Sequence, residues 1–137
     1  SAFFNLDRIV TKAGFKDFGT LQQDAAFVSL RSDSRWTELV KMTKKNSGID
    51  EATFDPALFA LIDSLAREDQ KWRQAAMDIQ NSGHVDSVQL ARAFESMRWT
   101  DSMDYFVLLK IIDEHGFPDY DKVGVDGTHY FWLKSIL

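Results

Sequence analysis

The chain has no cysteine among its 137 residues, and this absence excludes several kinds of site at once. Without cysteine there is no disulfide, no thiolate nucleophile and no Cys-ligated zinc. The three histidines, His84, His115 and His129, lie too far apart in sequence to share one helix turn, as zinc-binding pairs do. We therefore predict no metal site and no cofactor.

A surplus of positive charge is also missing. Lysine and arginine total 16 against 21 aspartates and glutamates, for a formal charge of -5, so binding to a nucleic-acid backbone is not expected. No stretch approaches the ~18 consecutive apolar residues of a spanning helix, and the N-terminus lacks a signal-peptide pattern. We predict a soluble protein without membrane insertion. The sequence leaves its compartment open, either cytoplasmic or exported from a bacterium.

Apolar residues make up 45% of the chain and aromatic residues 13%, which predicts a packed interior. Most of them recur at helical spacing. The pattern predicts an all-α fold, an irregular bundle of about six helices with little sheet. The expected segments are 2–13, short turns in 17–30, 33–46, 56–81, 84–99, 100–115 and 128–137. Val123-Gly124-Val125 is interpreted as a short strand or a tight bend.

The N-terminal third carries a series of spaced motifs, which read GF-x-D at Gly14, L-x-x-D at Leu21 and F-x-x-LR-x-D-x-RW at Phe27. Over about residues 2–45 this pattern resembles the closing segment of tetratricopeptide-repeat proteins. Ile9 departs from it, because repeat helices favour a small residue there. The resemblance implies a repeat tail at 1–47. The apolar face of its first helix, around Phe3 and Phe4, would contact missing upstream repeats or a second copy.

Residues 46–55 are polar and lead into Asp55-Pro56, a favourable helix start. We interpret them as a linker or module boundary, followed by a helical domain at 48–137. In the long helix that begins there, Asp69 falls on the apolar face, and Arg73 lies one turn further on. One interpretation is a structural ion pair that sets the helix register. The other is the floor of a pocket.

Two more titratable residues, Asp104 and His115, flank the apolar face of a later helix, and a turn rich in acids follows. Asp119-Tyr120-Asp121 begins like a calcium loop, but Val123 and Tyr130 stand where oxygen ligands are needed. There is no G-x-S-x-G nucleophile motif. The turn acids are therefore expected to be solvated, and His115 is expected to contact the last carbonyls of its helix.

Residues 58–133 contain D-Q-x-x-R at Asp69, D-x-x-D at Asp101, and G-x-P-x-x-x-x-V-G at Gly116. This order resembles a bacterial family of helical domains known only as a domain of unknown function, whose members usually continue beyond the last aromatic helix. The resemblance implies a fold, a possible C-terminal truncation and the place of a site, but no activity. The candidate pocket residues are Asp69, Trp72, Arg73, Asp104, Gly116, Pro118, Gly124 and Trp132.

The preferred function is a non-catalytic interaction or scaffold module that binds a protein. One alternative is an enzyme, such as a hydrolase, with Asp69, Asp104 and His115 as acid and base groups. Another is a sensor that binds a small ligand in the same pocket without turnover. A deep polar cleft with a bound ion or anion would favour the alternatives. A filled interior with an exposed apolar groove on Phe3, Phe4 and Ile9 would favour the interaction module.

Overall fold

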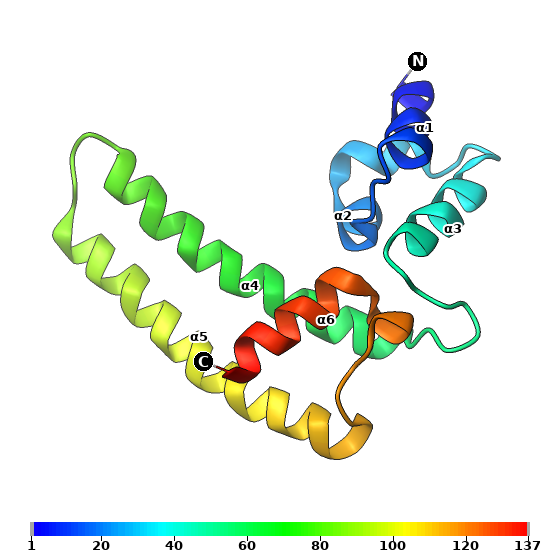
Figure 1. Cartoon of the computed structure of the whole chain (residues 1–137). Coiled ribbons are helices and arrows are strands. Elements are labelled where there is room, and N and C mark those ends of the chain that lie inside the picture. The colour runs from blue at the N-terminus through cyan, green and yellow to red at the C-terminus, as the bar shows by residue number, and fades with distance from the viewer. Residues whose placement is uncertain (1, 137) are drawn as a thin grey trace. The chain divides into compact units, whose positions relative to one another are not determined.

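The structure is a computed structural model that describes residues 2–136, and the side chains of residues 2–134. Over this range it is all-helical, as the apolar spacing predicted (Figure 1). The elements are α1 (Ala2–Lys12), α2 (Phe18–Gln23), the 3-10 helix η1 (Ala25–Leu30), α3 (Trp36–Asn46), α4 (Pro56–Asn81), α5 (Ser87–His115) and α6 (Tyr120–Ile136). Among these residues, no helix is both long and apolar enough to cross a bilayer.

The chain divides into two compact units. The first consists of Ser1–Ala60 with Pro118–His129, and the second of Leu61–Phe117 with Tyr130–Leu137. Helices α4 and α6 each contribute residues to both units. The boundary at residue 47 that the sequence suggested stays a prediction, because compact packing does not test family membership.

The core of the first unit lies between α1, α2 and α3. Its buried residues are Phe3, Leu6, Val10, Leu21 and Leu39. Asn46, at the end of α3, donates hydrogen bonds of 2.9 Å to the carbonyl oxygens of Val10 and Phe15. Phe3 was expected in an exposed groove and is instead part of this core, whereas Phe4 and Ile9 are exposed. The reason is the helical period, because Phe3, Leu6 and Val10 share one face of α1, whereas Phe4 lies about 130° and Ile9 about 90° from the centre of that face.

The polar residues of the N-terminal motifs shape the chain locally. Asp17 caps α2 by accepting from the Thr20 amide at 2.9 Å, and Asp24 caps η1 by accepting from the Ala26 amide at 2.9 Å. Arg31 donates to the carbonyl oxygens of Gln22 and Asp24. Helix capping and backbone hydrogen bonding therefore explain why these polar residues occur at these positions. Their resemblance to a repeat tail stays a prediction.

Residues 47–55, interpreted as a linker, are hydrogen-bonded to a segment that lies about seventy residues further along the chain. The amides of Asp50 and Asp55 donate to the carbonyl oxygens of Asp121 and Lys122, and the Val125 amide donates to the Ser47 oxygen at 2.8 Å. This part of the chain is therefore fixed within the first unit and is not a free tether.

Gly124 produces the bend expected at Val123-Gly124-Val125, and no strand forms there. Its φ of 80° and ψ of 161° interrupt α6, which continues on both sides. The C-terminal helix therefore begins earlier than Thr128, at Tyr120. Leu137, the expected last residue of that helix, lies outside the described residues.

The second unit is built on α4 and α5, joined by the loop 82–86 and running antiparallel (Figure 1). The prediction of two helices, at 84–99 and 100–115, is wrong, because α5 is one helix of 29 residues. Asp86 caps it by accepting from the amides of Val88 and Gln89. Thr100 lies inside the helix because no glycine or proline near it interrupts the backbone hydrogen bonds.

We expect Gly124→Ala to destabilise the chain more than Gly14→Ala. Both glycines have positive φ, but a Cβ at Gly124 would lie 3.2 Å from the Ser47 hydroxyl oxygen, and a Cβ at Gly14 would meet nothing within 4 Å. The backbone of Gly124 also lies in a region open almost only to glycine. Chemical denaturation should give losses of about 3 kcal/mol at Gly124 and about 1 kcal/mol at Gly14. Equal losses would contradict the role of the Ser47 contact.

Candidate functional site

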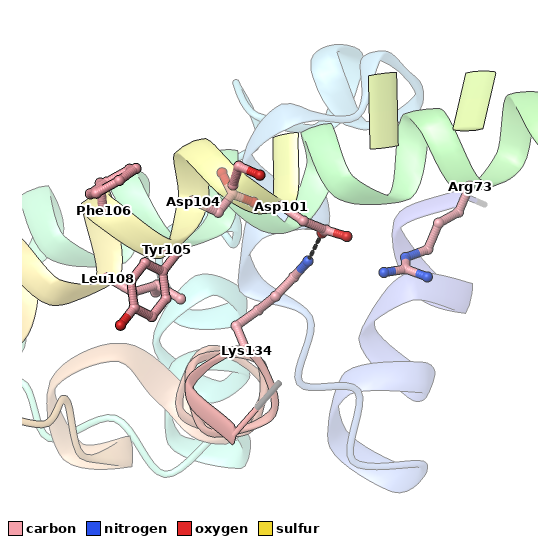
Figure 2. Close-up of a pocket in the computed structure, with 8 residues that line it drawn as sticks. Arg73, Asp101, Asp104, Tyr105, Phe106, Leu108 and Lys134 are labelled. Atoms are coloured by element: carbon pink, nitrogen blue, oxygen red, sulfur yellow. Dashed lines mark hydrogen bonds and ion pairs between the residues drawn. The ribbon is translucent and has the colours of Figure 1, made fainter. Parts of the chain in front are cut away.

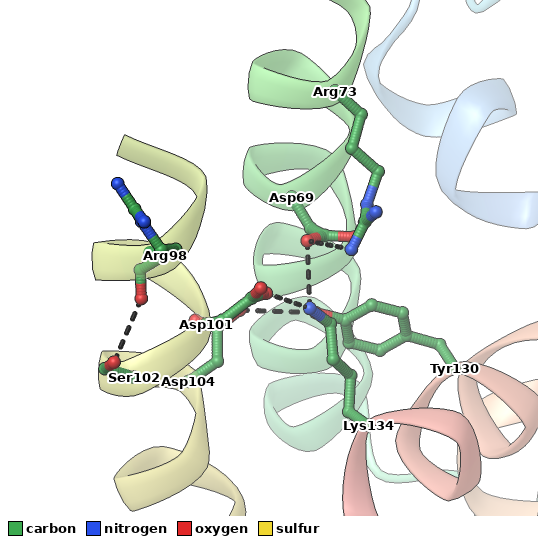
Figure 3. Close-up of polar contacts among 8 residues, drawn as sticks. All are labelled: Asp69, Arg73, Arg98, Asp101, Ser102, Asp104, Tyr130 and Lys134. Carbon is green, nitrogen blue, oxygen red and sulfur yellow. Dashed lines mark hydrogen bonds and ion pairs between the residues drawn. The ribbon is translucent and has the colours of Figure 1, made fainter. Parts of the chain in front are cut away.

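The second unit contains a cluster of charged side chains from three helices. Figure 3 shows it: α4 provides Asp69 and Arg73, α5 provides Asp101 and Asp104, and the end of α6 provides Tyr130 and Lys134. The cluster therefore combines three carboxylates with two cations and one phenol.

Lys134 is the centre of the cluster. Its ammonium nitrogen lies 2.9 Å from Asp69 Oδ1 and 2.6 Å from Asp101 Oδ1, so one cation joins carboxylates of α4 and α5. Its side chain is only 10% exposed. Burial by itself would lower the pKa of this lysine, but the hydrogen bonds to Asp101 and Asp69 outweigh it and leave the pKa raised. Lys134 is therefore charged at neutral pH.

Asp69 is the buried acid predicted from the helical wheel, with 7% exposure. Arg73 is the expected partner one turn away, with Nε 3.0 Å from Asp69 Oδ2. Burial acts to raise the pKa of Asp69, but the hydrogen bonds from Arg73 and Lys134 prevail, and the pKa is lowered. The carboxylate is therefore ionised and has a cation on each oxygen.

Asp104 is just as buried, at 5% exposure, but its surroundings differ. Within the part of the chain that the structure describes it forms no ion pair, and the Tyr130 hydroxyl donates to its Oδ2 at a long 3.5 Å. Burial raises the pKa of Asp104, and the nearby charges of Asp69 and Asp101 raise it further, against the opposing effect of Lys134. The same burial and the Asp104 charge raise the pKa of Tyr130.

The charges balance when Asp104 holds a proton. Asp69 and Asp101 then carry two negative charges, which offset the two positive charges of Arg73 and Lys134. Since uncompensated buried charge is costly, this neutral arrangement is the favoured one. Asp104 is consequently the group in the cluster best suited to hold and release a proton.

A pocket of about 540 Å³ opens beside the cluster, within the size range of small-molecule sites. Figure 2 shows charged side chains at one end and apolar ones at the other. The lining residues are Arg73, Asp101, Ser102, Asp104, Tyr105, Phe106, Leu108 and Lys134. This arrangement can hold a small molecule that has one polar end and one apolar end.

Of the residues that the sequence suggested for a pocket, Asp69, Arg73 and Asp104 come together in the cluster. Trp72 lies on another side of α4, where its indole nitrogen donates to Glu68 at 3.0 Å, and it lines a second hollow together with Trp99. Trp132 is half exposed. His115 is also exposed, eleven residues beyond Asp104 on the same helix, which places it about 16 Å away along the axis.

The turn residues have structural roles. Gly116 ends α5 with φ 73°, and its amide donates to the Ile112 oxygen at 2.9 Å. Pro118 and Gly124 belong to the first unit, where Pro118 is fully buried and Gly124 packs on Ser47.

Sequence reasoning did not place Lys134 or Tyr130 in the site, and it named Asp101 only as the first residue of the D-x-x-D motif. A signal was present. Lys134 is the one cation in the aromatic C-terminal helix predicted at 128–137, and it lies one turn after Tyr130. A lone cation beside inward-facing acids is a candidate partner for them. Its ammonium group now lies among three carboxylates, and no cluster of acids and histidines among residues 2–136 is arranged to hold a metal ion.

Comparisons with protein-family models, with curated protein sequences and with solved structures give no match for this chain. Both resemblances therefore stay predictions.

We expect the same substitution to have opposite effects at the two buried acids. Asp69→Asn leaves Lys134 and Arg73 without their shared carboxylate and should lower the free energy of unfolding by about 3 kcal/mol at neutral pH. Asp104→Asn removes the cost of either burying this charge or binding a proton on folding, and should raise the melting temperature at neutral pH. Thermal and chemical denaturation measure both, and Asp78→Asn on the exposed side of α4 should change stability by less than about 0.5 kcal/mol.

The pH dependence follows from the signs of the two shifts. The lowered pKa of Asp69 stabilises the fold above the unfolded-state pKa of about 3.9, and this stabilisation is lost as pH falls through the folded-state pKa. The raised pKa of Asp104 stabilises the fold below about 3.9, and this stabilisation is lost as pH rises through the folded-state pKa. The gain from Asp104→Asn should therefore vanish in acid, and a gain that persists there would exclude a protonated Asp104.

Proposed function

We propose that this chain is a non-catalytic protein-interaction module whose contact surface is the outer face of α5. The observation that carries this proposal is that α5 has large apolar side chains on two opposite faces. One face is buried in the second unit, through Ala93, Leu108 and Ile111. The other is exposed, and its largest members are Trp99 at 68% exposure and Phe106 at 65%.

The two faces are separated on the helix. At about 100° per residue, Val88, Trp99 and Phe106 fall within about 20° of each other, and they lie about 160° from the mean direction of the buried residues. These three are therefore directed away from the core of their own unit. Val88 is also exposed, at 59%.

A helix that is apolar all round is normally buried on all sides. Contiguous exposed apolar surface typically marks a binding surface, and aromatic side chains supply much of the affinity at protein interfaces. A partner that covers this face would remove Trp99 and Phe106 from water. On α1, Phe4 and Ile9 form a smaller exposed patch, for which the sequence suggested upstream repeats or a second copy.

The hydrolase alternative has less support from the geometry. It required Asp69, Asp104 and His115 to act together, but Asp69 is held ionised by two cations and His115 lies about 16 Å along the helix from Asp104. An acid and base pair must lie within hydrogen-bond reach of one reacting group.

Photo-crosslinking in the cells that produce the protein tests the interaction surface. With a benzophenone amino acid in place of Phe106, we expect a discrete protein adduct, because the side chain would lie against the partner. The same amino acid at Met77, which is 52% exposed on α4, serves as the control and should give none. Absence of an adduct at Phe106, or equal labelling at both positions, would contradict the proposal.

A second candidate function is binding of a small organic amine, and the observation that favours it is the buried Asp104 at the wall of the 540 Å³ pocket. An ammonium group would replace the proton on Asp104, and Tyr105, Phe106 and Leu108 would contact the apolar part of the ligand. Arg73 and Lys134 are already paired with carboxylates, which argues against an anionic ligand.

Thermal shift with a panel of primary amines tests this candidate. The amines should raise the melting temperature more as pH rises through the raised folded-state pKa of Asp104, because Asp104 must lose its proton to accept the ammonium group. Asp104→Asn should abolish the shift. A shift that survives in this variant would place the amines elsewhere.

A further inference from the structure

We propose that the partner of α5 is a second copy of this chain, bound antiparallel along the outer face of α5 with a twofold axis between Ser102 and Met103. This inference rests on the proposed interaction function and adds the identity and the register of the partner.

Between Arg92 and Asp113, eight exposed residues form one stripe along the outer face of α5. At about 100° per residue they fall within an arc of about 100°, opposite the buried face. From the N-terminal to the C-terminal end the stripe consists of Arg92, Glu95, Trp99, Ser102, Met103, Phe106, Lys110 and Asp113. Three of its four central residues, Trp99, Met103 and Phe106, are apolar or aromatic, and its charges lie only at the two ends.

The stripe is complementary to itself when it is reversed. With a twofold axis between residues 102 and 103, each residue lies opposite a residue of the second copy, and the numbers of the two residues add up to 205. Arg92 then faces Asp113 of the second copy, Glu95 faces its Lys110, and Trp99 faces its Phe106. Both charged pairs have opposite signs, and symmetry forms each pair twice.

The parallel alternative lacks this property. In a parallel pair in register, each residue faces its own copy, so Arg92 would face arginine and Glu95 would face glutamate. Like charges at these places are unfavourable, and such pairs are how interfaces exclude wrong arrangements. The charge pattern therefore selects the antiparallel arrangement as well as the partner.

The charged residues are free to make these contacts. Within the described part of the chain, Arg92, Glu95 and Asp113 form no ion pair, and Lys110 makes only a 3.8 Å contact with Glu114 between exposed groups. The outer charged pairs lie about 16 Å from the twofold axis. They come within reach if the helices cross at a shallow angle of about 20°, which is a common packing class.

The second unit also has a place for the aromatic side chain of the other copy. A hollow of about 670 Å³ lies between α4 and α5, and its lining includes Trp72, Arg92, Trp99 and Met103. Phe106 of the second copy meets Trp99 at the edge of this hollow. Contact between the two rings buries the most exposed aromatic residues of α5 on both copies.

Charge exchange within the purified full chain tests the register. Glu95→Lys and Lys110→Glu, made singly, each turn two attractive pairs into two repulsive ones and should weaken dimerisation by at least about tenfold in sedimentation equilibrium. The double variant Glu95→Lys with Lys110→Glu restores opposite signs and should recover the dissociation constant to within about threefold. An equimolar mixture of the two single variants should form mixed dimers.

Matched controls are available on α3, where Glu38→Lys and Lys41→Glu make the same charge changes at exposed positions and should leave the dissociation constant unchanged. Phe106→Ser should abolish the dimer while circular dichroism stays that of the unchanged chain, because this side chain is exposed. A chain that stays monomeric over the full concentration series, or a double variant as weak as the single ones, overturns the proposal.

Two measurements together distinguish failure of the self-association proposal from failure of the proposed interaction function. If the chain is monomeric but Phe106 cross-links to a protein of a different mass, the interaction surface stands and self-association is wrong. If the chain is monomeric and Phe106 gives no adduct, both are wrong. An adduct of twice the chain mass, together with recovery in the double variant, supports both.

Discussion

The ammonium group of Lys134 is the constraint on which the second unit depends. It is nearly buried, so it requires carboxylates, and it takes one from α4 and one from α5 while it belongs to α6 itself. Removing a cation from water is costly, and the cost is offset only if the partners are held at hydrogen-bond distance. Three helices therefore have to meet in one geometry. Asp69 makes the geometry more stringent, because its second oxygen is bound by Arg73.

This charged interior accounts for the distribution of apolar surface in the unit. Asp69 and Asp104 occupy inward positions that leucine or isoleucine would fill in an ordinary helical hairpin, so the interior buries less apolar area than the sequence contains. The remaining aromatic side chains of α5 face water. Helix α5 thus has Asp104 on its buried face and the stripe with Trp99 and Phe106 on its exposed face. The charged cluster can specify one packing arrangement of the helices or bind a ligand, and the exposed stripe can bind a partner.

In the first unit, the polar motif residues mostly form hydrogen bonds with nearby backbone groups, whereas the charged residues of the second unit join different helices. Asp17 and Asp24 cap short helices, and Arg31 binds carbonyl oxygens at the end of one of them. These contacts connect residues fewer than ten positions apart, so their sequence spacing was informative. The hydrogen bonds between residues 47–55 and 121–125 span about seventy residues and left no such local signal. That segment was accordingly interpreted as a linker.

The sequence by itself determined the all-helical fold, the inward position of Asp69 and its pairing with Arg73, because each of these follows from the helical period and from contacts within one turn. Only the tertiary structure decided that Lys134 completes the cluster, that Asp104 forms no ion pair with the described residues, and that Trp72 and His115 lie apart from it. The physical reason is the range of the interactions. A helix wheel specifies which residues of one helix share a face, but which helix supplies the opposing charge depends on packing between segments that are far apart in the chain.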